Sequence, residues 1–193
     1  MFLTREAAAA IREGACYFPV VAILGPRQSG KTTLVKQLFA KHAYISLEDL
    51  DAREAAQSDP RTFLITQANT DGLIIDEFQY VPELLSYIQT TVDNEKRLGF
   101  FVLTGAQNFL MNRAIGQSLA GRVSIHTLLP LAVHELAVNH KLPDQIESML
   151  YQGSYPAIYA LGTKPDLLYK NYLQTYIERD VRELTQVGNL TQF

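Results

Sequence analysis

The stretch at residues 25–32, GPRQSGKT, restricts the fold of this chain more than any other. It matches the pattern G-x-x-x-x-G-K-[ST] and lies between a continuous apolar run at 18–24 and an amphipathic run at 31–42. An uninterrupted apolar run is typical of a strand buried on both faces. Leu34, Val35 and Leu38 follow helical spacing. The pattern forms a phosphate-binding loop in this strand–loop–helix context.

Each part of the motif has a chemical reason. Gly25 and Gly30 allow backbone angles and close approaches that a Cβ would block. The N–H groups of such a loop and the start of the following helix attract phosphate. Lys31 is expected to reach the β- and γ-phosphates, and Thr32 to offer its hydroxyl to Mg²⁺. Arg27 either stabilises the loop or approaches the nucleotide. The residues predicted to bind nucleotide here are Gly25, Pro26, Arg27, Gln28, Ser29, Gly30, Lys31, Thr32 and Thr33.

A second apolar run, at 73–75, ends in the carboxylates Asp76 and Glu77. The carboxyl ends of parallel strands line the ligand crevice, so both acids are expected beside the phosphates. Asp76 would hold Mg²⁺ through its water shell, and Glu77 would orient or deprotonate the attacking water. Two solvated acids at a strand end are the alternative. The chain has no N-K-x-D tetrapeptide, which favours ATP over GTP.

Two further sets of polar residues are candidates for contact with the γ-phosphate. Thr104 and Gln107 lie at the end of the apolar run at 99–105 and just after it, although a polar turn after a strand is an equal alternative. Arg122 precedes the apolar run at 123–131 and could neutralise transition-state charge in its own subunit or in a neighbour. The alternative for Arg122 is a surface residue whose stem covers apolar atoms.

Strand and helix patterns alternate along the first part of the chain, which predicts an α/β fold with a parallel sheet. The expected strands are 18–24, 43–49, 72–77, 99–105 and 123–131. The expected helices are 4–13 (with Gly14 as its stop), 31–42, 50–69 (broken at Asp59-Pro60), 82–95 and 131–140. After residue 141 strand patterns stop, and two or three helices are expected. We therefore predict a P-loop core at 1–140 and a helical lid or appendage at 141–193.

Composition and charge limit the partners and the cellular compartment that we expect for this chain. The net charge of −3 excludes a strongly basic surface but neither supports nor excludes a local nucleic-acid patch. No apolar run approaches the roughly 20 residues that cross a bilayer, so we expect no membrane contact. The single cysteine, Cys16, cannot form a disulfide within the chain and is interpreted as a small buried hydrophobe. A cytoplasmic protein is expected.

The same motifs, in order, resemble a large group of prokaryotic AAA-type P-loop ATPases, similar to the signalling (STAND-like) ATPases. They are FPVVAILGPRQSGKTTL, LIIDEFQ, VLTGAQ, LAGRV, LLPLAVHEL, GSYP and YIERDV. The resemblance implies a five-stranded parallel sheet in the order 5-1-4-3-2, followed by a helical region. It also implies Walker A at 25–32, Walker B at Asp76 and Glu77, and a sensor at 104–107. Members of the group usually continue into a C-terminal domain of unassigned function, so this chain is interpreted as truncated.

These patterns together predict an ATPase that uses Mg²⁺ and acts as a nucleotide-driven switch. One alternative is a switch that turns over slowly without a partner, and another is a nucleic-acid-dependent ATPase. A small-molecule kinase is less favoured because no acceptor pocket is evident. A homo-oligomer is expected if Arg122 acts on a neighbouring subunit. A nucleic-acid or protein partner would bind through the missing C-terminal part.

Overall fold

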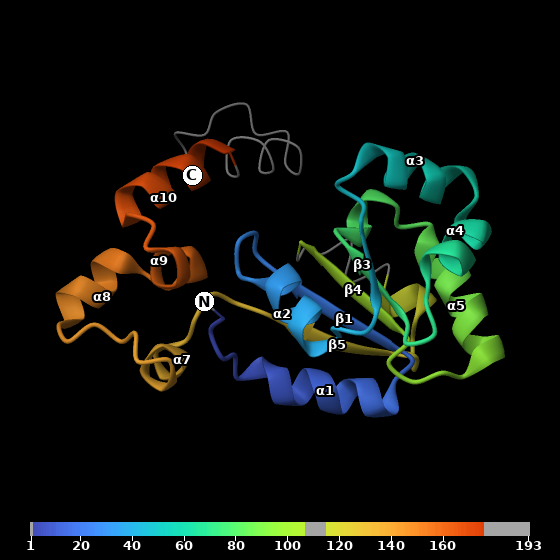
Figure 1. Cartoon of the computed structure of the whole chain (residues 1–193), viewed down its shortest axis with the longest axis horizontal. Helices are drawn as coiled ribbons and strands as arrows, with labels where there is room; N and C mark the ends of the chain where they lie inside the picture. Colours follow the sequence, from blue (N-terminus) through green and yellow to red (C-terminus); the bar gives the residue numbers. More distant parts are fainter. Residues whose placement is uncertain (1, 107–114, 176–193) are drawn as a thin grey trace. The chain divides into compact units, whose positions relative to one another are not determined.

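The computed structural model describes residues 2–106 and 115–175 (Figure 1). These residues fall into two compact units, one formed by Thr4–Pro130 and the other by the residues from Leu131 onward together with the N-terminal residues up to Leu3. The predicted phosphate loop lies in the first unit. Gln107 lies outside the described residues.

The first unit contains a five-stranded sheet in which all neighbouring strands are parallel. Its strands are β1 (Val20–Gly25), β2 (Ala43–Ser46), β3 (Leu73–Asp76), β4 (Phe101–Ala106) and β5 (Val123–Thr127). Their order across the sheet is β2-β3-β4-β1-β5. This is the predicted order 5-1-4-3-2 read from the other edge, so the predicted fold is confirmed. Strand β1 lies between β4 and β5 and is buried at all six positions, as its unbroken apolar sequence predicts.

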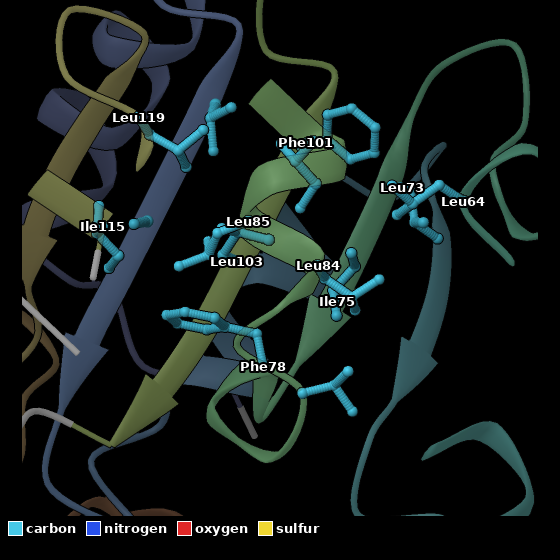
Figure 2. Close-up of a cluster of buried hydrophobic side chains, with 14 of the residues drawn as sticks. Leu64, Leu73, Ile75, Phe78, Leu84, Leu85, Phe101, Leu103, Ile115 and Leu119 are labelled. Atoms are coloured by element: carbon cyan, nitrogen blue, oxygen red, sulfur yellow. The ribbon is translucent and has the colours of Figure 1, made fainter. Parts of the chain in front are cut away.

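Helices cover both faces of this sheet (Figure 1). They are α1 (Ala7–Tyr17), α2 (Lys31–Leu38), α3 (Leu50–Ser58), α4 (Pro60–Gln67) and α5 (Leu84–Glu95), with a short 3₁₀ turn, η1 (Phe78–Tyr80). Side chains of α1 and α2 pack with Val21 and Ile23 of β1 on one face. On the other face, side chains of η1, α4 and α5, which include Phe78, Leu64 and Leu85 (Figure 2), form a cluster. Val20 and Ala22 of β1 belong to the same cluster. Alternate residues of β1 therefore belong to two separate cores.

Two local predictions in the first unit are wrong. Helix α1 continues past Gly14 to Tyr17. A Cβ on Gly14 would lie 2.4 Å from Ser124 Oγ of β5, so this glycine permits close packing and does not end the helix. Cys16 follows in the same helix and is exposed, not buried.

The break predicted at Asp59-Pro60 is confirmed. Asp59 ends α3, and its side chain accepts a hydrogen bond from the backbone N–H of Thr62 in the first turn of α4. Pro60 opens α4, where the missing N–H of a proline costs nothing.

The second unit is helical over its described residues. It contains α7 (Val133–Val138), α8 (Ile146–Gln152), α9 (Pro156–Leu161) and α10 (Pro165–Tyr172). Leu131 and Leu136 form a small core with Leu3, against which Tyr159 packs. No helix in the described part of the chain combines the length and apolar character that crossing a membrane requires.

Candidate functional site

The loop between β1 and α2 begins and ends with glycines that the backbone requires. A Cβ on Gly25 would lie 2.1 Å from the carbonyl oxygen of Leu128, in the segment that follows β5. Gly30 precedes α2 with a φ of 91°, in the left-handed region that favours glycine. Between them Ser29 is buried, whereas Gln28 is exposed. The local backbone therefore explains the first and second glycines of the motif.

Lys31 extends back over this loop. Its ammonium donates hydrogen bonds to the carbonyl oxygens of Gly25, at 3.0 Å, and Pro26, at 2.9 Å. Burial lowers the pKa of Lys31, while the charges of Glu77 and Asp76 oppose this shift and the charge of Arg27 adds to it. The ammonium of Lys31 thus lies within electrostatic reach of both predicted carboxylates and of the loop arginine.

Asp76, at the end of β3, is the centre of a hydroxyl cluster. Its Oδ2 accepts hydrogen bonds from Thr32 Oγ1 at 2.9 Å and from the Tyr44 hydroxyl at 2.8 Å. Its Oδ1 accepts one from Thr104 Oγ1. Only 4% of Asp76 is exposed. Three elements, α2, β2 and β4, therefore each supply a donor to one buried carboxylate of β3.

One donor to Asp76 is Thr104, which was predicted to contact the γ-phosphate, and another is Tyr44, which sequence reasoning missed. Thr104 is fully buried and directs its hydroxyl to Asp76. Tyr44 lies on β2, where Ser46 is paired with Asp76. Tyr44 is two residues before Ser46, so it lies on the same face of the sheet. Burial and the hydrogen bond to Asp76 raise the pKa of Tyr44, so the hydroxyl stays a donor at neutral pH.

Glu77 follows Asp76 with a φ of 55° and precedes the turn η1. Burial raises the pKa of Glu77, opposed by a hydrogen bond from Gln79 and by the charge of Lys31. The Gln79 amide donates to Glu77 Oε2 and so fixes one carboxylate oxygen. A partly desolvated carboxylate with a raised pKa is characteristic of a general base.

Arg5 is a second residue that sequence reasoning missed. It is 6% exposed, and its guanidinium donates to the carbonyl oxygen of Ser29, in the phosphate loop, at 2.8 Å. It also donates to the carbonyl of Leu129, in the segment after β5. Arg5 therefore joins the loop to a second segment of the same unit. Its distance from the motif in sequence gives no signal for this contact.

Arg122 is not brought to this cluster within its own chain. Its carbonyl accepts a hydrogen bond from Val20, at the start of β1, whereas the phosphate loop follows Gly25 at the end of that strand. The Arg122 guanidinium instead bonds both carboxylate oxygens of Asp93 in α5, at 2.5 and 2.9 Å. The prediction that Arg122 acts within its own subunit is therefore not supported by its position. Its action on a neighbouring subunit stays a prediction.

The donors near the loop suit a hard divalent cation. No group of three or more His, Cys, Asp or Glu side chains that could hold a metal alone occurs among the described residues. Mg²⁺ does not need such a group, since it usually keeps several waters and binds through one or two carboxylates together with substrate phosphates. The Thr32 hydroxyl and the Asp76 carboxylate, 2.9 Å apart, are oxygen donors of the required kind.

Comparison with known families and relatives agrees with this geometry. Residues 17–137 match the family model described as an AAA domain, and residues 143–193 match a domain of unknown function (DUF8612). The uncharacterised proteins Rv2008c of Mycobacterium tuberculosis and Mb2031c of Mycobacterium bovis are each 32% identical to this chain over 186 residues. These matches cover 93% of this chain and 40% of each relative, so the chain spans well under half of their length.

Three solved structures share the fold. The Walker-type ATPase PABY2304 of Pyrococcus abyssi has a TM-score of 0.58 at 17% identity, covering 96% of this chain and 75% of that protein. The STAND protein PH0952 of Pyrococcus horikoshii has a TM-score of 0.55 at 17% identity, covering 90% and 32%. AMPPCP-bound DnaA of Aquifex aeolicus has a TM-score of 0.53 at 14% identity, covering 96% and 67%. At these identities the likeness concerns the fold alone.

Proposed function

This chain belongs to the AAA-type P-loop ATPases, and we propose that it binds ATP with Mg²⁺ and hydrolyses it to ADP and phosphate. One observation carries the proposal: the Lys31 ammonium lies inside the phosphate loop and within electrostatic reach of Asp76 and Glu77. The proposed phosphate-binding cation, the proposed metal-binding acid and the half-buried proposed base would therefore act together at the carboxyl edge of one parallel sheet. Ligands of open α/β sheets bind at this edge.

The loop would bind the phosphates of ATP. Its N–H groups, including that of Gly30 at the start of α2, would donate to the phosphate oxygens. Lys31 would exchange its bonds to the loop carbonyls for bonds to the β- and γ-phosphates. Arg27, whose charge acts on Lys31, adds positive potential beside these oxygens. The loop would thereby hold the nucleotide in a fixed position for reaction.

Thr32 and Asp76 would hold the magnesium ion. Their side chains already contact each other, and both offer oxygen to a hard cation. When bound there, Mg²⁺ would neutralise negative charge that develops on the phosphate oxygens. Thr104 keeps Asp76 in place from the neighbouring strand β4.

Glu77 would position and deprotonate the attacking water. The water oxygen forms a bond to the γ-phosphorus, the bond to the β–γ bridging oxygen breaks, and ADP leaves with that electron pair. The proton from water passes to the Glu77 carboxylate, whose raised pKa makes it a better acceptor than an exposed glutamate. The hydrogen bond from Gln79 holds the carboxylate during this step.

The consequence of turnover would be a switch. Contacts to the γ-phosphate are lost on hydrolysis, and proteins of many kinds use that loss to change the state of a second element. The helical unit that begins at Leu131 is the proposed responding element.

The first experiment measures phosphate release from ATP at steady state for the wild type and Glu77→Gln, together with nucleotide binding. We expect release to fall at least about a hundredfold in Glu77→Gln, as for loss of a general base, while ATP binding persists. The same assay with added DNA tests a nucleic-acid-dependent ATPase, for which DNA would stimulate release and the stimulation would fall with salt. Equal release by wild type and Glu77→Gln would refute the role of Glu77, and absence of ATP binding would refute the proposed function.

A further inference from the structure

We propose that Tyr44 is a positioning residue for the magnesium ion: its hydroxyl holds Asp76 so that the carboxylate binds the water shell of Mg²⁺ and not the ion directly. Because this role presupposes ATP and Mg²⁺ binding at the phosphate loop, it rests on the proposed function. The carrying observation is that Tyr44 and Thr32 donate to the same oxygen, Asp76 Oδ2, at 2.8 and 2.9 Å.

The acceptor positions of Asp76 are nearly used up. A carboxylate offers about four lone-pair positions, two on each oxygen. Thr32 and Tyr44 use the two on Oδ2, and Thr104 uses one on Oδ1. The oxygen that contacts the predicted metal ligand Thr32 therefore has no lone pair left for a metal ion. The remaining position, on Oδ1, suits a hydrogen bond from a metal-bound water.

The ring of Tyr44 is held by the same helix that supplies Thr32. The ammonium of Lys36 lies 3.4 Å from the centre of the Tyr44 ring, a cation–π contact. Thr32 and Lys36 are four residues apart on α2 and so lie on one face of the helix. That face touches Asp76 with one side chain and Tyr44 with the other, which links the position of the tyrosine to the start of the phosphate-loop helix.

Loss of the hydroxyl should change the metal preference. In Tyr44→Phe, one lone pair of Oδ2 becomes available, and the carboxylate is free to ligate a cation directly. Mg²⁺ gives up its waters reluctantly, whereas Mn²⁺ exchanges them readily and also takes carboxylate ligands. The variant should therefore bind nucleotide less well with Mg²⁺ and nearly normally with Mn²⁺.

The experiment titrates a non-hydrolysable ATP analogue into the full chain by calorimetry, with Mg²⁺, with Mn²⁺ and with EDTA. For Tyr44→Phe we expect affinity with Mg²⁺ to fall about tenfold, the scale of one hydrogen bond to a charged group. Affinity with EDTA should be unchanged, and affinity with Mn²⁺ should stay within about twofold of the wild type. The control is Tyr17→Phe, since Tyr17 is 70% exposed on α1; it should match the wild type in all three conditions.

The outcomes separate this inference from the proposed function. If the wild type binds the analogue in none of the conditions, both are overturned. If the wild type binds more tightly with Mg²⁺ and Tyr44→Phe does the same, only the role of Tyr44 is overturned. An equal loss with Mg²⁺, Mn²⁺ and EDTA would mean that Tyr44 merely supports the fold, which also overturns the inference. A loss confined to Mg²⁺ supports it.

Discussion

Thr104→Val tests whether Thr104 serves to hold Asp76. Thr104 is fully buried on β4, next to β3, and donates its hydroxyl to Asp76 Oδ1. Valine keeps the branched shape at this position and suits a strand, so the main change is the loss of one donor. Asp76 would retain its hydrogen bonds from Thr32 and Tyr44 on the other oxygen.

The expected cost follows from the buried charge. A hydrogen bond to a charged group contributes about 1.5–3 kcal/mol, and a buried acceptor that loses its partner costs a similar amount. Because Asp76 keeps two donors on Oδ2, we expect the free energy of unfolding to fall by about 2 kcal/mol. Denaturant titration of the nucleotide-free protein at neutral pH measures this change. The slope of the unfolding transition should stay constant, since the surface exposed on unfolding does not change.

A γ-phosphate sensor predicts a different result for the same variant. Loss of a sensor would leave the nucleotide-free protein as stable as the wild type and would reduce the preference for ATP over ADP. The matched control is Thr127→Val, on an exposed position of β5, which should change stability by no more than about 0.5 kcal/mol. A change of the same small size in Thr104→Val would refute the reasoning about Asp76.

Three further variants test other parts of the site. Gln79→Leu removes a hydrogen bond that lowers the pKa of Glu77, so that pKa should rise. Since the ionised carboxylate is the proposed base, the acidic limb of the profile of turnover against pH should move to higher pH. An unmoved limb would contradict this. Gly25→Ala places a Cβ 2.1 Å from the Leu128 carbonyl oxygen, so the free energy of unfolding should fall by about 1–3 kcal/mol in denaturant titration; an unchanged midpoint would refute the close approach. Mixing Arg122→Ala with Glu77→Gln protein and measuring phosphate release tests whether Arg122 acts between subunits. If it does, each variant alone is inactive and the mixture recovers turnover. Failure of the mixture to recover turnover would count against that role.

Much of the fold could be predicted because burial leaves a direct mark on the sequence. Strand β1 is apolar at consecutive positions since its alternate residues enter two different cores. The order of the strands came from the family resemblance, because periodicity does not say which strands pair. Gly14 was misread because glycine serves both to end helices and to let a helix approach a sheet, and only the contact with Ser124 decides between them.

The candidate site also has a part that local sequence predicts and a part that depends on strand pairing. A local motif was enough to nominate Lys31 and Thr32 as site candidates, and a place at the end of a strand was enough to nominate Asp76 and Glu77. The partners of these residues were not predictable, because they depend on which strands are neighbours. Tyr44 reaches Asp76 only because β2 lies beside β3 at the edge of the sheet.

Burial shifts the pKa values of Glu77 and Lys31 in the directions that disfavour their charged forms. It raises the pKa of Glu77 and lowers that of Lys31. Each charge partly compensates the other, yet burial remains the largest influence on both. A group whose pKa is raised on folding reduces stability once the pH exceeds its unfolded value, so ionised Glu77 weakens the fold at neutral pH. This cost in stability is consistent with the proposed role of Glu77, since hydrolysis would require a charge that burial opposes.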